Sequence, residues 1–105
     1  MNSPQVSIVL PVRNGEKYIS ESIQSLLSQT FSEFECIVID DGSTDATLGI
    51  LKKISDPRIR IFSNEKSEGI AAALNFGIKK STTNIIVRMD ADDWAYPQRL
   101  EIQIN

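Results

Sequence analysis

Three aspartates near the end of this 105-residue chain have the spacing of a metal-binding segment. Asp90 and Asp92 directly follow an apolar run over residues 85–89, and Asp93 stands beside them. Residues two apart in an extended segment point to the same side, so both carboxylates can approach one cation. Mg²⁺ and Mn²⁺ prefer such oxygen ligands and keep open positions for substrate phosphates. The pattern predicts a Mn²⁺ or Mg²⁺ site at Asp90 and Asp92, with a solvated acidic loop as the structural alternative.

A second acidic segment, residues 40–43 (DDGS), follows the apolar run over residues 34–39. Asp, Gly and Ser suit turns and helix starts, so an ordinary turn is the structural alternative here. We expect Asp40 to have a structural role or to support its neighbour. Asp41 is the better candidate for accepting a hydrogen bond from a base N–H, which would favour uracil or thymine over cytosine.

A third polar segment, Pro11 to Gly15 (PVRNG), ends the first apolar run. It lacks the G-x-G-x-x-G turn of dinucleotide sites, and the chain has no G-x-x-x-x-G-K-[ST] loop. A bound phosphate would therefore need another partner, for which a metal on Asp90 and Asp92 is suited. We expect Pro11 and Asn14 to shape a flat slot for a base, with Arg13 either stacked on it or solvated.

The composition excludes several other classes of site. The net charge of −3 argues against a nucleic-acid partner, because phosphate backbones attract basic faces. Without histidine there is no Ser-His or Cys-His nucleophile, and the single cysteine, Cys36, is expected to be a small buried hydrophobe. No apolar run approaches the roughly 20 residues of a membrane span. We expect a cytoplasmic protein, with peripheral contact at the inner face of the membrane left open for a full-length protein.

Alternating apolar patterns place these polar segments at the ends of strands. The hydropathy predicts strands at residues 6–12, 34–39, 59–62 and 85–89, with helices at 18–29, around 45–54 and at 69–79, and a short helix near Pro97. Strands that are apolar on both sides and alternate with helices indicate an α/β fold with an open, mainly parallel sheet. The strand order 3-2-1-4 is expected, and ligands of such sheets bind beyond the carboxyl ends of the strands.

Two finer expectations concern the helices. The second helix should be N-capped by Ser43, Thr44 or Asp45, since these residue types accept hydrogen bonds from exposed helix N–H groups. The third helix should turn one face inward, formed by residues at helical spacing: Ile70, Leu74, Gly77 and Ile78.

Four segments in order resemble the large inverting glycosyltransferase family 2, which has a GT-A fold. They are VSIVLPVRNGEKYI, SIQSLLSQTFSEFECIVIDDGSTDAT, GIAAALNFGI and MDADDWAYPQRLEIQ, and together they extend over nearly the whole chain. The resemblance implies a nucleoside-diphosphate sugar donor, a divalent metal, and a saccharide, lipid-linked or other acceptor. It also implies that this is a Rossmann-like nucleotide-binding half and that a polysaccharide-forming hexosyltransferase is the enzyme type.

The same resemblance implies roles for individual residues. Pro11 would contact the base region, Asp41 the uracil ring, Asp90 the ribose or sugar side and Asp92 the metal, while Asp93 would support them. Two positions depart from the family pattern: Arg13 stands where many relatives carry an aromatic residue, and Leu74 where many carry arginine. Loss of base stacking and of one phosphate or sugar contact would follow.

The chemistry implied is a single displacement that inverts the anomeric carbon. The family's general base is a carboxylate in a later acidic motif, which would lie beyond Asn105. Residues 1–105 are thus expected to be the donor- and metal-binding N-terminal part of a longer transferase domain, inactive alone. The exposed edge of the strand at 85–89 predicts that the chain alone forms a homodimer. A non-catalytic Mg²⁺- and nucleotide-binding module and a nucleotidyltransferase remain the alternatives.

Overall fold

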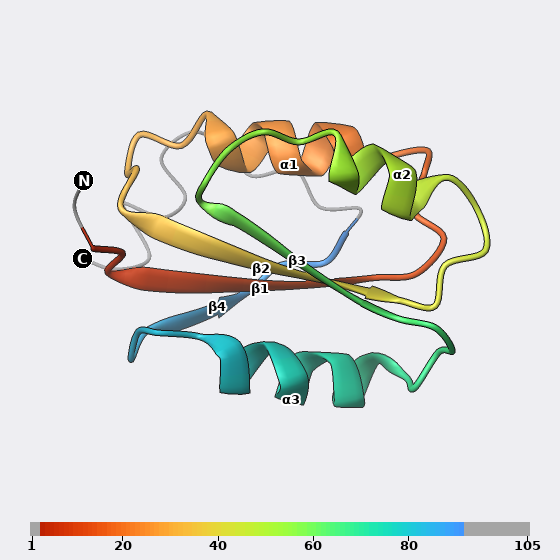
Figure 1. Ribbon diagram of the computed structural model, residues 1–105. Helices are drawn as coiled ribbons and strands as arrows, with labels where there is room; N and C mark the ends of the chain where they lie inside the picture. Colours follow the sequence, from red (N-terminus) through yellow and green to blue (C-terminus); the bar gives the residue numbers. More distant parts are fainter. Residues whose placement is uncertain (1–2, 92–105) are drawn as a thin grey trace.

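A four-stranded parallel sheet forms the centre of the protein, seen in the computed structural model, which describes residues 3–91 (Figure 1). Its strands are β1 (Val6–Val12), β2 (Phe34–Asp41), β3 (Ile59–Asn64) and β4 (Ile86–Arg88). The spatial order is β3-β2-β1-β4, and every neighbouring pair is parallel. The predicted α/β class and the predicted strand order 3-2-1-4 are therefore confirmed.

Helices cover both faces of this sheet. The helices α1 (Ile19–Leu27) and α2 (Thr47–Lys52) lie on one face, and α3 (Ile70–Lys80) lies on the other (Figure 1). None of these three helices, within residues 3–91, is long and apolar enough to cross a membrane.

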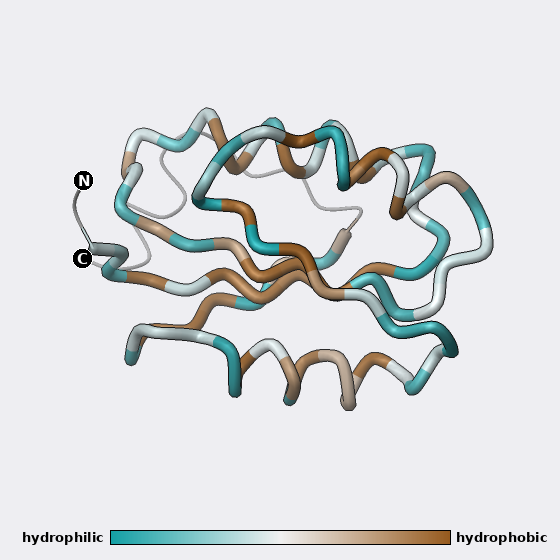
Figure 2. Tube along the Cα trace, in the orientation of Figure 1, coloured by the Kyte–Doolittle hydropathy of each residue, from teal (hydrophilic) through white to brown (hydrophobic). Residues whose placement is uncertain are grey.

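The side chains of the two central strands alternate between two cores (Figure 2). In β2, Cys36 and Val38 join the larger core under α1 and α2, whereas Ile37 and Ile39 join the smaller core under α3. Both faces of the strand are apolar, as the two-sided parallel arrangement requires. Cys36 is fully buried, and desolvation raises its thiol pKa to about 12, so it behaves as the buried hydrophobe that was predicted.

The helix α3 approaches the sheet closely through its smallest residues. Ala73 and Gly77 are buried, and a side chain at Gly77 would collide with Val9 and Ile39. The predicted inward face was wrong for Ile70 and Ile78, which are 55% and 47% exposed. The tight contact at Gly77 centres the helix on its small residues, so the larger apolar residues are displaced to its flanks.

Two predicted element boundaries also differ from the structure. Strand β2 continues through Asp40 and Asp41, because these residues pair with Val12 of β1 and Asn64 of β3. The N-cap of α2 is Ala46, which offers no side-chain cap, so the predicted capping residue was wrong. Ser43 and Thr44 bind the loop that follows β1, and Asp45 accepts a hydrogen bond from the Thr47 N–H at 2.9 Å without being the cap.

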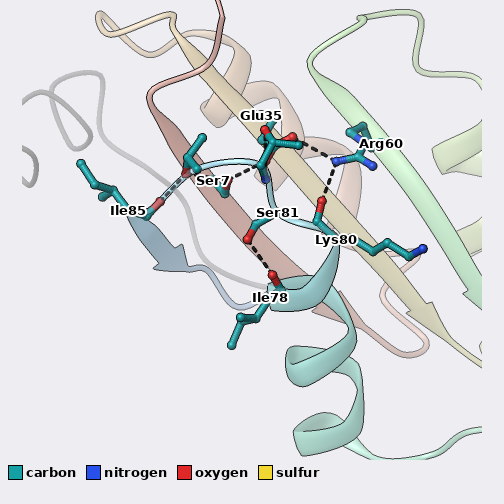
Figure 3. A network of polar contacts seen from close by, with 9 residues as sticks. Ser7, Glu35, Arg60, Ile78, Lys80, Ser81 and Ile85 are labelled. Carbon is teal, nitrogen blue, oxygen red and sulfur yellow. Dashed lines mark hydrogen bonds and ion pairs between the residues drawn. The ribbon is translucent and has the colours of Figure 1, made fainter.

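A buried carboxylate joins three strands at the amino end of the sheet, below the end of α3 (Figure 3). The Glu35 side chain, in β2, accepts hydrogen bonds from Ser7 of β1 at 2.6 Å and from Arg60 of β3 at 3.0 Å. It also accepts the Thr82 backbone N–H at 2.7 Å and the Thr82 hydroxyl at 3.0 Å. Glu35 thereby holds the connection from α3 to β4, the strand that leads to the predicted metal segment.

Candidate functional site

The carboxyl end of the sheet brings together the three polar segments predicted from the sequence. Pro11 lies next to the end of β1, and Asp41 is the last residue of β2. Val9 pairs with Arg88 in β4, so Asp90, two residues further along, is level with Pro11. All three segments therefore reach one edge, which is where parallel α/β sheets bind ligands.

A cavity of about 190 Å³ lies at this edge, beside the start of α3. Its lining comes from the ends of β1 and β2 and from the β3–α3 loop: Pro11, Val12, Arg13, Asp41, Ser67, Gly69 and Ile70. The structure thus brings together Pro11, Arg13 and Asp41, three of the residues predicted to bind the nucleotide. Ser67, Gly69 and Ile70 were missed, although the polar stretch NEKSEG between a strand and a helix marks a loop at this edge.

The Asp41 carboxylate is buried and holds the β3–α3 loop. Its Oδ1 accepts hydrogen bonds from the Asn64 side chain at 3.1 Å and from the Glu68 N–H at 2.8 Å. Its Oδ2 accepts the Ser67 hydroxyl at 2.8 Å and the Gly69 N–H at 3.0 Å. Burial alone would raise the pKa of Asp41, but these four hydrogen bonds outweigh it and hold the pKa below its ordinary value. The cavity therefore has an ionised carboxylate in its wall at neutral pH.

Gly42 permits this close approach of the β3–α3 loop to Asp41. Its φ of +69° lies in the left-handed region that favours glycine. A Cβ at this position would stand 2.5 Å from the Ser67 backbone nitrogen and 2.8 Å from the Lys66 carbonyl carbon. Any side chain at residue 42 would therefore push the loop away from the carboxylate.

Asp40 points to the opposite face of the sheet from Asp41, because neighbouring residues of a strand alternate. It is 2% exposed, and its Oδ1 has no hydrogen-bond partner among the residues that the structure describes. This position agrees with the structural or supporting role expected for Asp40, and it separates Asp40 from the cavity.

Asn14 lies beside the cavity without lining it. Its side-chain Oδ1 accepts hydrogen bonds from the Thr44 N–H at 2.8 Å and the Thr44 hydroxyl at 3.3 Å. Its own N–H donates to the Ser43 hydroxyl at 2.9 Å. The structure therefore does not bring the Asn14 side chain together with Pro11, Arg13 and Asp41.

Asp90 supplies a carboxylate at the β4 side of the same edge. It is half exposed and forms an ion pair with Arg88, whose Nη2 lies 3.0 Å from Oδ1. The next residue, Ala91, is tied to α1 because its carbonyl oxygen accepts a hydrogen bond from Ser22. Asp92 and Asp93, the other residues predicted for the metal segment, lie outside the described residues.

The donor chemistry at Asp90 fits a hard divalent cation, since a partly solvated carboxylate oxygen is a ligand that Mg²⁺ and Mn²⁺ accept. Within residues 3–91, no group of three or more Asp, Glu, Cys or His side chains is arranged to hold a metal ion. A site built on Asp90 would thus need Asp92 as well, as the sequence pattern predicts.

Leu74, where the family pattern has arginine, is partly buried and packs against the smaller core with Phe62. It therefore takes part in anchoring α3. A polar contact from this position to a ligand is replaced here by apolar packing.

A larger cavity of about 720 Å³ lies at the other end of the sheet. Its arginines are engaged with neighbouring carboxylates: Arg58 pairs with Asp56 at 2.9 Å and Arg60 with Glu35 at 3.0 Å. Because ligands of parallel sheets bind at the carboxyl ends, we assign the candidate site to the smaller cavity.

Comparison with protein families matches residues 7–105 to the model described as Glycosyl transferase family 2. Two relatives extend over the full length of the chain. One is an uncharacterized glycosyltransferase of Haemophilus influenzae, 40% identical, of which the chain covers 43%. The other is the UDP-Glc:alpha-D-GlcNAc-diphosphoundecaprenol beta-1,3-glucosyltransferase WfgD of Escherichia coli, 39% identical, of which it covers 42%. The chain thus spans less than half the length of these relatives.

Solved structures show the same arrangement of strands and helices. S. aureus TarS 1–349, in complex with UDP-GlcNAc, superimposes with a TM-score of 0.89 at 32% identity, over 95% of this chain and 30% of that one. The mannosyltransferase PcManGT of Pyrobaculum calidifontis, in complex with GDP-Man and Mn²⁺, gives 0.83 at 26% identity, over 97% and 31%.

Proposed function

The chain belongs to glycosyl transferase family 2, and on this premise we propose that it is the donor-binding part of an inverting, metal-dependent glycosyltransferase. The donor is a nucleoside-diphosphate sugar, with UDP as the nucleotide. The single observation that carries the proposal is the cavity in which Pro11 and Arg13 of the first strand end meet the ionised Asp41 carboxylate.

Asp41 recognises the base in this proposal. A carboxylate offers about four lone-pair positions, and in the structure all four accept hydrogen bonds. An imide N–H of uracil therefore takes the place of one existing donor. The Ser67 hydroxyl is the donor that yields, because it is an exposed side chain that turns about one bond, whereas the Glu68 and Gly69 N–H groups are fixed in the backbone.

Arg13 forms another wall of the cavity and is exposed. Its planar guanidinium can stack on the base face, a role that an aromatic residue serves equally well. The same positive charge favours a nearby diphosphate, which suits a site without a glycine-rich phosphate loop.

The metal is proposed to be held by Asp90 and Asp92, with Asp93 supporting them. When bound, Mn²⁺ or Mg²⁺ supplies charge stabilisation for the departing diphosphate. The mannosyltransferase structure that contains Mn²⁺ supports a divalent metal for this fold. The ion pair between Arg88 and Asp90 orients the Asp90 carboxylate at the edge of the sheet.

The acceptor half of the reaction belongs to residues beyond Asn105 in this proposal. There a carboxylate base would take the proton of the acceptor hydroxyl, so that the new glycosidic bond forms as the bond to the diphosphate breaks. A saccharide or lipid-linked acceptor is proposed, supported by the diphosphoundecaprenol substrate in the name of the Escherichia coli relative. Such an acceptor would bring the whole protein, from the cytoplasm, to the inner face of the membrane.

Calorimetric titration with UDP, CDP and NAD, with and without Mn²⁺, tests the proposal. We expect UDP to bind at least tenfold more tightly than CDP, about 1.4 kcal/mol, since cytosine has no ring N–H to donate to Asp41. Tighter binding of NAD than UDP would contradict a sugar-nucleotide site. A nucleotidyltransferase would bind a nucleoside triphosphate in preference to UDP, and a non-catalytic module would leave UDP-sugar intact in the full-length protein.

A further inference from the structure

The β1–α1 loop and the β2–α2 loop run side by side above the carboxyl end of the sheet. Three consecutive N–H groups of the first loop donate to side chains of the second. The Asn14 N–H donates to Ser43 at 2.9 Å, that of Gly15 to Thr47 at 2.8 Å, and that of Glu16 to Asp45 at 3.3 Å. Every acceptor lies on the segment that follows Asp41 in the chain.

Hydrogen bonds in the opposite direction close the same interface. The Asn14 side-chain oxygen accepts from the Thr44 N–H and hydroxyl, and the Glu16 carboxylate accepts from the Ala46 N–H at 3.1 Å. We name these six bonds, between residues 14–16 and residues 43–47, the interloop network.

Asn14 holds an unusual backbone conformation within this network. Its φ of 54° is left-handed, and among residues 3–91 it is the one non-glycine residue with a positive φ. Asparagine tolerates this region better than most residues, yet the conformation still has a cost in free energy. Conformations of this kind persist where surrounding contacts over-determine them, and here the three hydrogen bonds to Ser43 and Thr44 do so.

The network joins the two strand ends that form the cavity. Arg13, which lines the cavity, directly precedes Asn14, and Asp41, which lines it from the other strand, stands two residues before Ser43. The Asn14 side chain is turned to Thr44 and is not part of the cavity lining. A ligand would therefore sense Asn14 through the separation of Arg13 and Asp41.

We propose that Asn14 is a positioning residue for nucleotide binding: its side-chain oxygen, bonded to Thr44, sets the width of the slot between Arg13 and Asp41. This role rests on the proposed function, because it assumes that a nucleoside occupies the slot. It differs from a direct contact of Asn14 with the ligand, which the residue type alone had suggested.

Two substitutions at the same position separate the two roles. Asn14→Gly keeps the left-handed backbone without strain but removes the oxygen that accepts from Thr44. Asn14→Asp keeps an oxygen for Thr44 but removes the amide donor and adds a negative charge, which a direct contact with the diphosphate would not tolerate. Ser43→Ala weakens the network from a residue that does not line the cavity.

The experiment is calorimetric titration of the chain and its variants with UDP and, separately, with uridine, in the presence of Mn²⁺. Asn14→Gly should lower the affinity for both ligands by the same factor, about tenfold, since loss of one or two hydrogen bonds widens the slot around the base. Asn14→Asp should stay within about threefold of the wild type, and Ser43→Ala should lose about threefold. Asn84→Gly, an exposed asparagine of the α3–β4 loop, is the matched control and should bind as the wild type does.

Each other result has a definite meaning. A loss for UDP without a loss for uridine, or a loss in Asn14→Asp as large as in Asn14→Gly, would assign Asn14 to direct ligand contact and overturn the positioning role. Unchanged affinity in Asn14→Gly and Ser43→Ala, whatever their melting temperatures, would reduce the network to stability and overturn it as well. Failure of the wild type to bind UDP would overturn the proposed function itself, and this result is visible before any variant is compared.

Discussion

Glu35 provides the sharpest test of how the sheet is held together, because it is a carboxylate that is 5% exposed and joins three strands and a loop (Figure 3). Replacing it by alanine leaves the Thr82 N–H without its acceptor and breaks the contact with Arg60. Ser7 keeps Thr83 as an alternative partner at 2.8 Å. We expect the free energy of unfolding to fall by about 3 kcal/mol, typical for removing one partner of a buried, hydrogen-bonded charge.

Two milder variants should rank below this one. Glu35→Gln retains an acceptor for Thr82 but turns an amide donor toward Arg60, for a loss of about 1.5 kcal/mol. Arg60→Met keeps the apolar stem of a side chain that is 37% exposed, and should lose less than about 1 kcal/mol. Glu33→Gln, on the neighbouring exposed glutamate that accepts from Gln5, is the control and should change stability by less than about 0.5 kcal/mol.

The pH dependence gives a second signature. Burial raises the pKa of Glu35, but hydrogen bonds from Ser7, Thr82 and Arg60 outweigh it and hold the pKa below its ordinary value of 4.5. A lowered folded-state pKa stabilises the protein above the unfolded pKa, and this contribution is lost as the pH falls through the folded pKa. The difference in stability between wild type and Glu35→Gln should therefore be largest at neutral pH and shrink below about pH 4.5.

Urea denaturation followed by circular dichroism, at several pH values between 3 and 7, measures both effects. The other carboxylates with lowered pKa, such as Asp41 and Asp56, are common to all variants and cancel in the differences. A loss in Arg60→Met equal to that in Glu35→Ala would show that the exposed ion pair, not the buried carboxylate, carries the stability. A wild type–Gln difference that stays constant from pH 7 to pH 3 would refute the linkage.

Three further predictions concern the ligand and the assembly. Asp41→Asn should lower the affinity for UDP at least tenfold and the free energy of unfolding by about 2 kcal/mol, because an amide cannot accept from all four donors; calorimetry on the folded variant that shows unchanged UDP affinity would return Asp41 to a purely structural role. Removing divalent metal with EDTA should weaken UDP binding about tenfold, and Asp92→Ala should reproduce this loss more fully than Asp93→Ala; binding that is indifferent to EDTA argues against the metal. The chain should also form a dimer in light scattering through the edge at β4, where Ile86 is 38% exposed, and Ile86→Lys should shift it to a monomer; a wild-type monomer at high concentration would contradict this.

Much of the architecture could be predicted from the sequence. Apolar runs with turn residues between them located all four strands, and the two-sided apolarity of residues such as Val38 and Ile39 indicated a parallel sheet with helices on both faces. Connectivity rules then led to the strand order and to the edge at which ligands bind. These features follow from hydropathy along the chain and from the fixed periods of strands and helices, both of which are local properties.

Other features depended on contacts between distant segments. Glu35 reads in the sequence as one charged residue in an apolar strand, and its burial depends on Ser7, Arg60 and Thr82. The inward face of α3 was decided by the close approach at Gly77, a contact with two strands that no helical period contains.

The candidate site divides along the same line. The residue types at positions 11, 13 and 41 indicated a nucleotide slot, whereas the saturation of Asp41 by the β3–α3 loop and the turning of Asn14 toward Thr44 appear only in the folded chain. A short polar side chain has many local partners of similar energy, so its partner is chosen by which loops the packed sheet brings within hydrogen-bond distance. Residue chemistry and spacing determined which groups reach this edge, and tertiary packing decided which of them face the ligand.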